Sequence, residues 1–398
     1  MMPEAFSLRT PMPKILFLSH TAALGGAEIV LFHNVCGLAK RGFSVEVVLW
    51  NDGPLADQFR AANIPTRVFS MGGALETLKK DGAQTANSGK AALAFSLLRG
   101  VFRLRRLIAK SGADIVFCNS LKSDLLGGLA ARFAGKTVVW HLHDRIAPDY
   151  LSPKTVALFR LAARLLPHKI AAISRSVAQT VPACAAKTRV IHNGTPIPEL
   201  GDPKLGTARA PFCDSRPTFA LVARISPWKG QDVFIEAAAI ARERLPDARF
   251  QIVGDALFGE ADFKAKIELQ VRQLGLWHNL EWLGFRRDVP ALMDAADCVV
   301  HASTLGEPFG MVIIEAMARA RPVIASRGGA TPEIVTHETD GLLVEMGDAQ
   351  ALADAMIRLA QNPGFARQIA RRGRETAQAR FSLERTLDEW QTFLEGLK

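Results

Sequence analysis

The stretch EPFGMVIIE, residues 307–315, decides the fold because it carries the chain from a buried strand into a helix. The apolar run Cys298–His301 before it predicts a strand, and Gly310–Arg319 predicts a helix, with proline and glycine marking the loop between them. Backbone N–H groups at such a helix start favour an anion. Glu307 and Glu315 would then place one carboxylate at each end of that anion. The alternative is a capped core helix with two solvated acids.

The same alternation of short buried strands and longer helices runs through the whole chain. In the first half the predicted strands are Lys14–Ser19, Ser44–Trp50, Asp114–Asn119 and Thr137–Leu142. In the second half they are Thr218–Ala223, Arg249–Val253, Leu280–Leu283, Cys298–His301 and Pro322–Ala325. This alternation predicts an α/β fold with two doubly wound, Rossmann-like parallel-sheet domains. Ligands of such sheets bind beyond the carboxyl ends of the strands, so we expect the site in a cleft where the two sheets face each other.

A proline-rich segment divides the two series of strands. Five prolines and several glycines fall between Gly194 and Pro217 without an apolar period, which is typical of a linker. We therefore predict a first domain over residues 1–196, a linker over 197–217, a second domain over 218–380 and a final helix over 381–398.

Composition excludes several classes of protein. The 398 residues are 48% hydrophobic and 22% charged, which is typical of a globular chain, and no apolar run of about 18 residues predicts a membrane span. The five cysteines are scattered without a Cys-x-x-Cys pair, which favours a reducing cytoplasm and no structural zinc. The chain has a single tyrosine, and we expect no stretch that interleaves Lys and Arg with exposed aromatic residues, which argues against nucleic acid as a partner.

The net charge of +10 is unevenly placed. Residues 1–200 hold 25 Lys and Arg against 12 Asp and Glu, whereas residues 201–398 hold 24 against 27. A basic first half predicts an anionic partner, such as a membrane surface, a phospholipid or a phosphorylated acceptor. Leu97–Lys110 and Lys154–Lys169 are cationic and amphipathic, so we expect them to lie reversibly on anionic lipid at the inner face of the cytoplasmic membrane. Ordinary covering helices with solvated basic faces are the alternative.

Glycines and a histidine follow strands of the first domain. Gly25 and Gly26 stand at a predicted helix start, where the missing side chains let a phosphate or sugar approach the backbone. The pattern Gly-x-Gly-x-x-Gly is absent there, which argues against a nicotinamide or flavin cofactor. His143 ends a strand and shares a face with His141, so its imidazole could donate to a sugar hydroxyl or support charge. A tight turn and structural histidines are the alternatives.

Two cations follow the first strand of the second domain. Arg224 can bond two oxygens of a diphosphate at once, and Lys229 is a compact point charge next to a glycine. Gly254 could allow close approach of a ligand and Phe285 could flank a base ring, although both residues have structural alternatives. No Asp-x-Asp triplet occurs, so we expect cations and helix amides to hold a diphosphate without a metal ion.

In this order, the motifs resemble the family-four glycosyltransferases of the GT-B fold over nearly the whole chain. The elements are Gly25-Gly26, His143-Asp144, the segment Val190–Gly194, Arg224 with Lys229, and Glu307 with Glu315. One departure is that the family's usual Pro-Asn-Gly reads His192-Asn193-Gly194 here. The resemblance implies a retaining hexosyltransferase that needs neither metal nor cofactor. Its donor would be a UDP- or GDP-sugar, and its acceptor a glycan, glycolipid or lipid-linked molecule of polysaccharide or cell-envelope biosynthesis.

The resemblance also implies roles for single residues. The catalytic set would be His143 at the transferred sugar, Arg224 and Lys229 at the leaving diphosphate, and Glu307 on sugar hydroxyls. The donor-binding set would be Gly25, Gly26, Gly254, Phe285, Arg286, Phe309, Gly310, Met311, Val312 and Glu315, with Glu315 on the ribose. The final helix would return to the first domain with Trp390.

Two rival functions remain open. A non-hydrolysing sugar-nucleotide epimerase has the same architecture, although the spacing of the two glutamates and the Arg/Lys loop favour transfer. A non-catalytic nucleotide-sugar sensor should lack His143, Arg224 or Glu307, and all three are present. The nucleotide, the sugar, the acceptor and the oligomeric state stay open.

Overall fold

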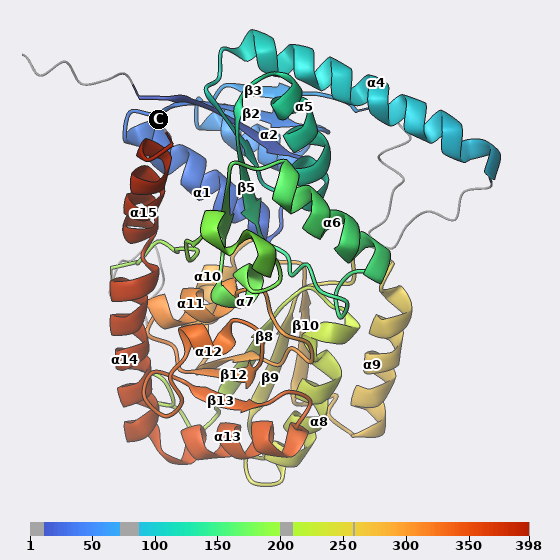
Figure 1. Ribbon diagram of the computed structural model, residues 1–398. Helices are drawn as coiled ribbons and strands as arrows, with labels where there is room; N and C mark the ends of the chain where they lie inside the picture. Colours follow the sequence, from blue (N-terminus) through green and yellow to red (C-terminus); the bar gives the residue numbers. More distant parts are fainter. Residues whose placement is uncertain (1–11, 72–86, 200–209, 258, 398) are drawn as a thin grey trace, which may run out of the picture. The chain divides into compact units, whose positions relative to one another are not determined.

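The computed structural model describes residues 12–71, 87–199, 210–257 and 259–397 (Figure 1). The chain divides into two compact units. Unit 1 comprises Met1–Ile173, Val177–Ile191 and Leu387–Lys398, and unit 2 comprises Ser174–Ser176 and His192–Thr386. The chain therefore returns to unit 1 at its C-terminal end.

Unit 1 is built on a parallel sheet with the strand order β3-β2-β1-β4-β5-β6-β7 in the described residues. The strands are β1 Lys14–Ser19, β2 Ser44–Leu49, β3 Thr66–Val68, β4 Ile115–Cys118, β5 Thr137–Leu142, β6 Lys169–Ala172 and β7 Thr188–Val190. The helical segments in this part of the chain are α1 Gly26–Lys40, α2 Pro54–Ala61, α4 Asn87–Ser111, the π-helical turn η1 Ser123–Gly127, α5 Gly128–Phe133, α6 Pro153–Leu165, α7 Arg175–Ala178 and the 3-10 turn η2 Pro182–Lys187. Strand order reverses between β1 and β4, the kind of switch point at which open α/β sheets bind ligands.

Unit 2 repeats the plan with the strand order β10-β9-β8-β11-β12-β13, again parallel throughout. The strands are β8 Thr218–Val222, β9 Arg249–Val253, β10 Leu280–Gly284, β11 Cys298–His301, β12 Val323–Arg327 and β13 Leu342–Glu345. The helical segments are the 3-10 turn η4 Pro227–Lys229, α8 Gln231–Arg242, α9 Ala261–Gln273, α10 Val289–Ala295, α11 Met311–Ala318, α12 Thr331–Ile334, α13 Ala349–Gln361 and α14 Pro363–Phe381. The last helix, α15 Leu383–Glu395, begins in unit 2 and belongs to unit 1 from Leu387 onward. The switch point of unit 2 lies between β8 and β11.

Aromatic side chains fix the strands at that second switch point. Phe219 of β8 and Phe250 of β9 stack with ring centroids 5.8 Å apart, and Phe234 of α8 meets Phe250 edge-on at 6.1 Å. All three rings are 0% exposed. This packing joins the amino-terminal parts of β8 and β9 to the first turn of α8 in one buried layer.

The strands predicted from apolar runs are confirmed, but four short strands, β3, β6, β7 and β13, were not predicted. The basic segment Lys154–Lys169 is not a single helix, because α6 ends at Leu165 before Pro167 and Lys169 begins β6. Between β4 and β5, the π-helical turn η1 leads directly into α5. Most of the predicted linker, residues 200–209, lies outside the described residues. Among the described helices, none is long and apolar enough to cross a membrane.

Candidate active site

The loop before α11 and the loop after β8 meet at the switch point of unit 2. Lys229, the last residue of η4, donates from Nζ to Oε2 of Glu307 at 2.8 Å. His301 Nε2 lies 3.1 Å from the same oxygen, and the Ser303 hydroxyl donates to it at 3.0 Å. Oε1 of Glu307 has no such donor among the described residues. One carboxylate oxygen is therefore engaged by three side chains, and the other by none of them.

The electrostatics of this cluster keep Glu307 ionised. The side chain is buried, and burial by itself would raise the pKa of Glu307. The positive charge of Lys229 and the hydrogen bond from His301 outweigh that effect and hold the pKa of Glu307 well below its usual range. At neutral pH the carboxylate is a permanent acceptor, which suits it to bind hydroxyl groups of a sugar.

Two glycines explain why these loops come so close. Gly230 has φ +70°, and a Cβ there would lie 1.9 Å from the carbonyl oxygen of Ala302, so only glycine lets α8 begin directly against the end of β11. Gly310 has φ +110° at the N-cap of α11. The first of these contacts sets Lys229 beside Glu307, and the second turns the chain from the glutamate loop into the helix.

Arg224 is the other cation that was predicted to bind the diphosphate. It lies two residues after the end of β8. Its carbonyl oxygen accepts a 3.0 Å hydrogen bond from the fully buried side chain of Gln231, so the backbone at Arg224 is held by the start of α8. Arg224 and Lys229 thus belong to one loop supported at both ends by α8. No observation in the described residues tests whether Arg224 and Lys229 bind a diphosphate. Their roles at the leaving group stay predictions.

The first turn of α11 carries the other predicted donor-binding residues. Phe309 is 2% exposed and Met311 and Val312 open the helix, one turn before Glu315. Burial raises the pKa of Glu315, and the charge of Arg319 only partly offsets this. The pKa values of the two glutamates are therefore shifted in opposite directions: that of Glu307 is lowered and that of Glu315 is raised.

Two of the other predicted donor residues have structural partners of their own. A Cβ on Gly254, which has φ +140°, would lie 2.0 Å from the carbonyl oxygen of Ala223, so this glycine is needed for β9 to pass β8. The Arg286 guanidinium binds both carboxylate oxygens of Asp288, at 2.7 and 2.5 Å, on the surface. Phe285 is 57% exposed. A donor role for these three residues is neither confirmed nor contradicted.

The histidines of unit 1 lie beside its switch point: His141 is on β5, the strand next to β4, and His143 follows the end of β5. His143 Nε2 and His141 Nδ1 each lie 3.0 Å from Oδ1 of Asn119, which follows β4, and 3.0 Å from each other. Burial lowers the pKa of His143 to about 4, although Asp144 acts in the opposite direction. A pKa this low makes His143 neutral at physiological pH.

Supporting groups surround this histidine and the predicted glycines. The hydroxyl of Tyr150, the chain's single tyrosine, donates to Asp144 Oδ1 at 2.5 Å. A Cβ built on Gly26, at the start of α1, would meet nothing within 4 Å, so the space beside that backbone is open to a ligand. A Cβ on Gly25 would lie 2.7 Å from the carboxylate of Glu28, the end of a flexible side chain.

Several residues of these clusters were missed in the sequence. His301 and Ser303 stand at alternate positions at the end of β11, where side chains share a face, and this is the signal that could have found them. Asn119 follows a strand as His143 does, but a lone asparagine after a strand gives no comparable signal. Among the described residues, no group of three His, Cys, Asp or Glu side chains is arranged to hold a metal. The expectation of a metal-independent reaction remains a prediction.

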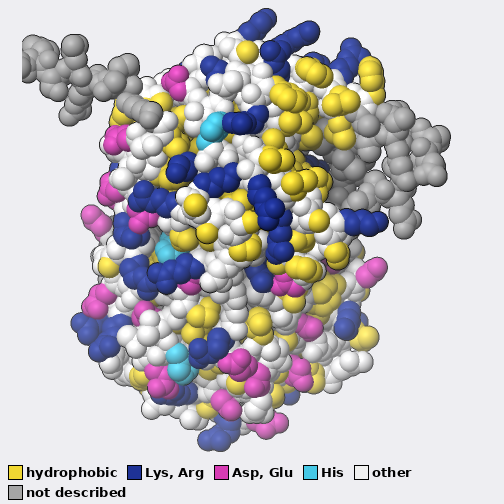
Figure 2. Space-filling model, in the orientation of Figure 1, with side chains coloured by type: hydrophobic (Ala, Val, Ile, Leu, Met, Phe, Trp, Pro, Cys, Tyr) yellow, Lys and Arg dark blue, Asp and Glu magenta, His cyan; other side chains and the backbone are white. Residues whose placement is uncertain are grey.

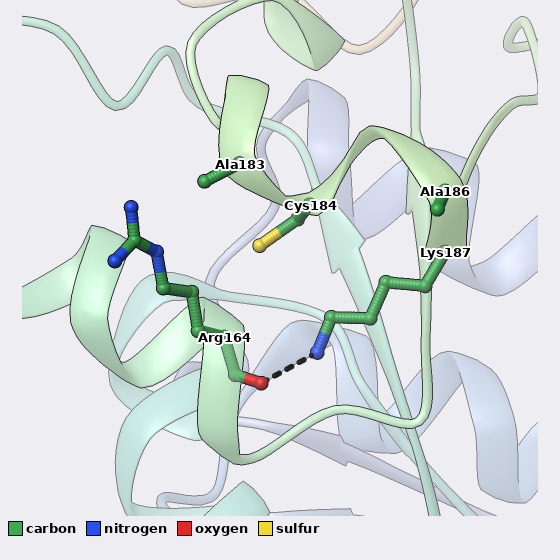
Figure 3. A pocket seen from close by; sticks show the side chains of 5 residues that line it. All are labelled: Arg164, Ala183, Cys184, Ala186 and Lys187. Carbon is green, nitrogen blue, oxygen red and sulfur yellow. Dashed lines mark hydrogen bonds between the residues drawn. The ribbon is translucent and has the colours of Figure 1, made fainter.

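A separate hollow in unit 1 has a structural explanation. Its volume is about 290 Å³, and it is lined by Arg164, Ala183, Cys184, Ala186 and Lys187 (Figure 3). Lys187 Nζ donates to the carbonyl oxygens of Arg164 and Pro167, at 3.0 and 2.8 Å. The lysine thus caps the C-terminal end of α6, where the helix dipole disfavours an anion. We assign no ligand to this hollow.

Comparison with known proteins covers both halves of the chain. Residues 24–197 match the family described as Glycosyltransferase Family 4, and residues 208–376 match the family described as Glycosyl transferases group 1. The chain is 28% identical over 369 residues to the UDP-Gal:alpha-D-GlcNAc-diphosphoundecaprenol alpha-1,3-galactosyltransferase of Escherichia coli, covering 87% of each chain. Over 183 residues it is 33% identical to a GDP-mannose-dependent phosphatidylinositol monomannoside mannosyltransferase of Corynebacterium glutamicum, covering 44% of this chain and 45% of that one.

Solved structures resemble the whole chain. The crystal structure of Anabaena Alr3699/HepE in complex with UDP and glucose superposes with a TM-score of 0.81 at 29% identity, covering 96% of this chain and 99% of that one. The lipopolysaccharide outer core galactosyltransferase WaaB, in its apo form, has a TM-score of 0.70 at 17% identity over 97% of this chain, which is a likeness of fold alone. These neighbours share the two parallel-sheet domains described above.

Proposed function

Since the chain belongs to the family-four glycosyltransferases of the GT-B fold, we propose that it transfers a hexose with retention from a UDP- or GDP-linked sugar to a lipid-linked or glycan acceptor. The observation that carries this proposal is the engagement of one Glu307 oxygen by Lys229, His301 and Ser303. A carboxylate held in this way, beside a cation and a helix N-terminus, fits the two ends of a sugar diphosphate. The relatives named above use UDP-galactose and GDP-mannose, which supports both nucleotides as candidates.

The chemistry follows from where charge develops. As the bond from sugar to diphosphate breaks, negative charge grows on the leaving group and positive charge on the sugar ring. Arg224 and Lys229 stabilise the first, together with the amides of the opening turn of α11. Glu307 binds sugar hydroxyls and Glu315 binds the ribose. Because these groups are fixed before the reaction, they act more strongly on the transition state than on the bound donor.

The Lys229–Glu307 ion pair adds a step to donor binding. Lys229 is 18% exposed and faces the carboxylate in this structure. A diphosphate offers the lysine a more highly charged partner, so donor binding draws Lys229 away from Glu307 while His301 and Ser303 continue to hold Oε2. The carboxylate then accepts from sugar hydroxyls in place of the ammonium group. No proton has to move in this exchange.

His143 completes the proposed catalytic set from unit 1. Its neutral imidazole, with a pKa near 4, can donate one hydrogen bond and accept another without adding charge to the sugar. We propose that it contacts a hydroxyl of the transferred hexose. The proton of the attacking acceptor hydroxyl passes to the leaving diphosphate oxygen on the same face of the sugar, so neither histidine nor metal is needed as a base.

A donor panel and a transfer assay test this function. Thermal unfolding is measured with UDP-, GDP- and ADP-sugars, and the stabilising donor is then incubated with lipid-linked acceptors in the presence of EDTA. Transfer with retained anomeric configuration supports the proposal. An epimerised nucleotide-sugar formed without acceptor would instead establish the epimerase. Donor binding by the chain with no turnover of any acceptor or donor would favour the sensor.

We further propose that the acceptor is met at an anionic membrane surface through a face of unit 1. Seven of the large apolar side chains exposed in the described residues lie on three of its helices, which sets this face apart from the rest. They are Phe95, Leu98 and Phe102 of α4, Phe133 of α5, and Leu158, Leu161 and Leu165 of α6. We name them the α4–α6 face. Figure 2 shows hydrophobic side chains gathered beside Lys and Arg in the upper right, where Figure 1 draws these helices.

Charge supports a lipid partner for the α4–α6 face. No aspartate or glutamate occurs between Asp81 and Asp114 or between Asp149 and Glu199, so the helices present cations alone around the apolar side chains. Phe102 and Phe133 stack with ring centroids 6.5 Å apart, which joins α4 to α5 in one apolar patch. Apolar side chains within a basic surface suit insertion among anionic headgroups.

Vesicle flotation tests this surface. Wild-type chain should float with vesicles that contain phosphatidylglycerol, more strongly at low salt, and should not float with purely zwitterionic vesicles. Replacing Leu158, Leu161 and Leu165 by Gln should abolish flotation. Leu269→Gln is the matched control, since Leu269 is 54% exposed on α9 of unit 2. Salt-independent flotation, or equal flotation of the triple variant, would show that these helices are ordinary covering helices.

A further inference from the structure

The C-terminal part of α15 places the buried side chain of Trp390 against His141 of unit 1. Trp390 is 1% exposed, and its ring meets that of His141 edge-on, with centroids 4.9 Å apart. It meets Phe117 of β4 in the same way at 5.1 Å. His141 is also 1% exposed, and the indole is one of the rings packed against its imidazole. Trp390 had been expected in the first domain, but not against a histidine.

His141 in turn is the ring neighbour of His143. The two imidazole centroids are 4.0 Å apart, and His141 Nδ1 lies 3.0 Å from His143 Nε2. Asn119 Oδ1 lies 3.0 Å from both nitrogens. The orientation of the His143 ring is therefore set by Asn119 and His141, and the position of His141 is set by Trp390 behind it.

The polar atoms of this stack indicate a role beyond packing. Nε2 of His141 and Nε1 of Trp390 are both buried with no hydrogen-bond partner among the described residues. Burying such atoms unpaired costs stability, which leucine or phenylalanine at either position would avoid. A core that served stability alone would gain from those replacements. The presence of histidine and tryptophan here fits a requirement for the shape and the ring chemistry of these two side chains.

The helix that carries Trp390 is itself anchored to α1. Asp388 pairs with Arg41 at 2.7 Å, and Leu387 packs so closely on Gly37 that a Cβ there would lie 2.4 Å from the leucine side chain. Figure 1 draws this end of α15 beside α1. The indole therefore has a fixed platform, which is what a group needs in order to hold another side chain within a fraction of an ångström.

We propose that Trp390 and His141 are positioning residues for His143, so that the C-terminal helix sets the catalytic rate through a stack of three rings. This inference rests on the proposed function, in which His143 contacts the transferred sugar. Trp390 acts on His141, and His141 acts on His143; neither of the first two touches substrate. Their loss displaces the His143 ring and leaves the donor-binding groups of unit 2 untouched.

Substitutions on α15 provide the test in the full chain. Trp390→Leu should lower kcat by about 10- to 100-fold, because misplacement by about 1 Å of a catalytic group costs on that order, while KM for the donor changes less than about threefold. Trp390→Phe keeps an aromatic edge against His141 and should recover most of kcat. Phe393→Leu is the matched control, since Phe393 is buried on the same helix and its ring centroid lies 5.7 Å from that of Trp390. Its kcat should stay near wild type.

Imidazole nitrogen NMR separates this inference from the proposed function. The ring resonances of His143 should shift in Trp390→Leu and stay in place in Phe393→Leu, whether or not the chain transfers sugar. Unchanged His143 resonances with unchanged kcat in Trp390→Leu would overturn the inference, as would an equal loss of kcat in Phe393→Leu. If His143→Gln kept full turnover while the resonances shifted as expected, the catalytic role of His143 would fail and the positioning contact would stand.

Discussion

The two glutamates of residues 307–315 should respond in opposite directions when their charge is removed. Glu307→Gln keeps the size of the side chain but leaves the Lys229 ammonium group without its partner, 2.8 Å away. Removing one member of a buried ion pair costs about 3–5 kcal/mol. Lys229 is 18% exposed and can regain some water, so we take the lower end, about 3 kcal/mol, as the expected loss in the free energy of unfolding at pH 7.

Glu315→Gln should behave differently, because burial raises the pKa of Glu315 and Arg319 only partly offsets it. A folded-state pKa above the unfolded value means that the folded chain binds protons more tightly. Stability from this group is present at low pH and is lost as pH rises through the folded pKa. Neutral glutamine removes that loss, so Glu315→Gln should leave stability at pH 7 unchanged or raise it, by on the order of 1 kcal/mol. Both variants should still lose donor affinity.

Hydrogen exchange read by mass spectrometry suits this comparison, because a chain of two units need not unfold in one step. Peptides that cover β11 and α11 report the local opening free energy in each variant at pH 7. A loss below about 1 kcal/mol in Glu307→Gln would refute the buried ion pair. An equal loss in both variants would refute the assignment of opposite pKa shifts. The double variant Lys229→Met with Glu307→Gln should recover much of the loss, because no unpaired charge remains.

Three further predictions concern the reaction and its pH dependence. Arg224→Ala and Lys229→Ala should each lower turnover about a hundredfold or more, because each removes a cation from the leaving diphosphate. Initial rates at saturating donor measure this effect. Near-normal rates in both variants would contradict the proposed site. Dialysis against EDTA should leave the transfer rate unchanged, whereas a loss restored by Mg²⁺ or Mn²⁺ would show that a metal is required. Acidification from pH 6.5 to about 4 should destabilise unit 1, since the pKa of His143 is about 4 when folded and near 6.5 when unfolded, so the unfolded chain takes up the proton. The full effect is worth about 3 kcal/mol, and His143→Gln should lack it in hydrogen exchange of β5.

Strands with continuous apolar runs could be predicted from the sequence, and the others could not. β1, β5 and β11 are nearly fully buried, and each carries a run of at least three apolar residues. β3 has only three residues, all of them at least partly exposed, and β7 is similar. Such strands exist because a neighbouring strand offers hydrogen bonds at the sheet edge. That is a property of the assembled sheet and leaves no local pattern.

The same holds for the site: the residue types could be read from the sequence, but the contacts between distant residues could not. Glu307 and Lys229 were assigned to opposite ends of a donor, and their direct contact comes from the close passage of Gly230 by Ala302. His301 was taken as part of an apolar strand, because one histidine in a buried run looks like core. Only the structure shows that His301, the last residue of β11, lies 3.1 Å from the Glu307 carboxylate. Sequence gives the residue types, and the switch point decides which of them meet.

Electrostatic complementarity explains why the two switch points are built so differently. At the switch point of unit 2, a fixed cation and a fixed carboxylate neutralise each other, so both can be held ionised in a buried loop until a ligand offers each a better partner. Beside that of unit 1, burial keeps His141 and His143 neutral. Neutral imidazoles carry no charge that could hold them in place by attraction. They must therefore be held by packing, which is why the largest side chain of the C-terminal helix lies behind them.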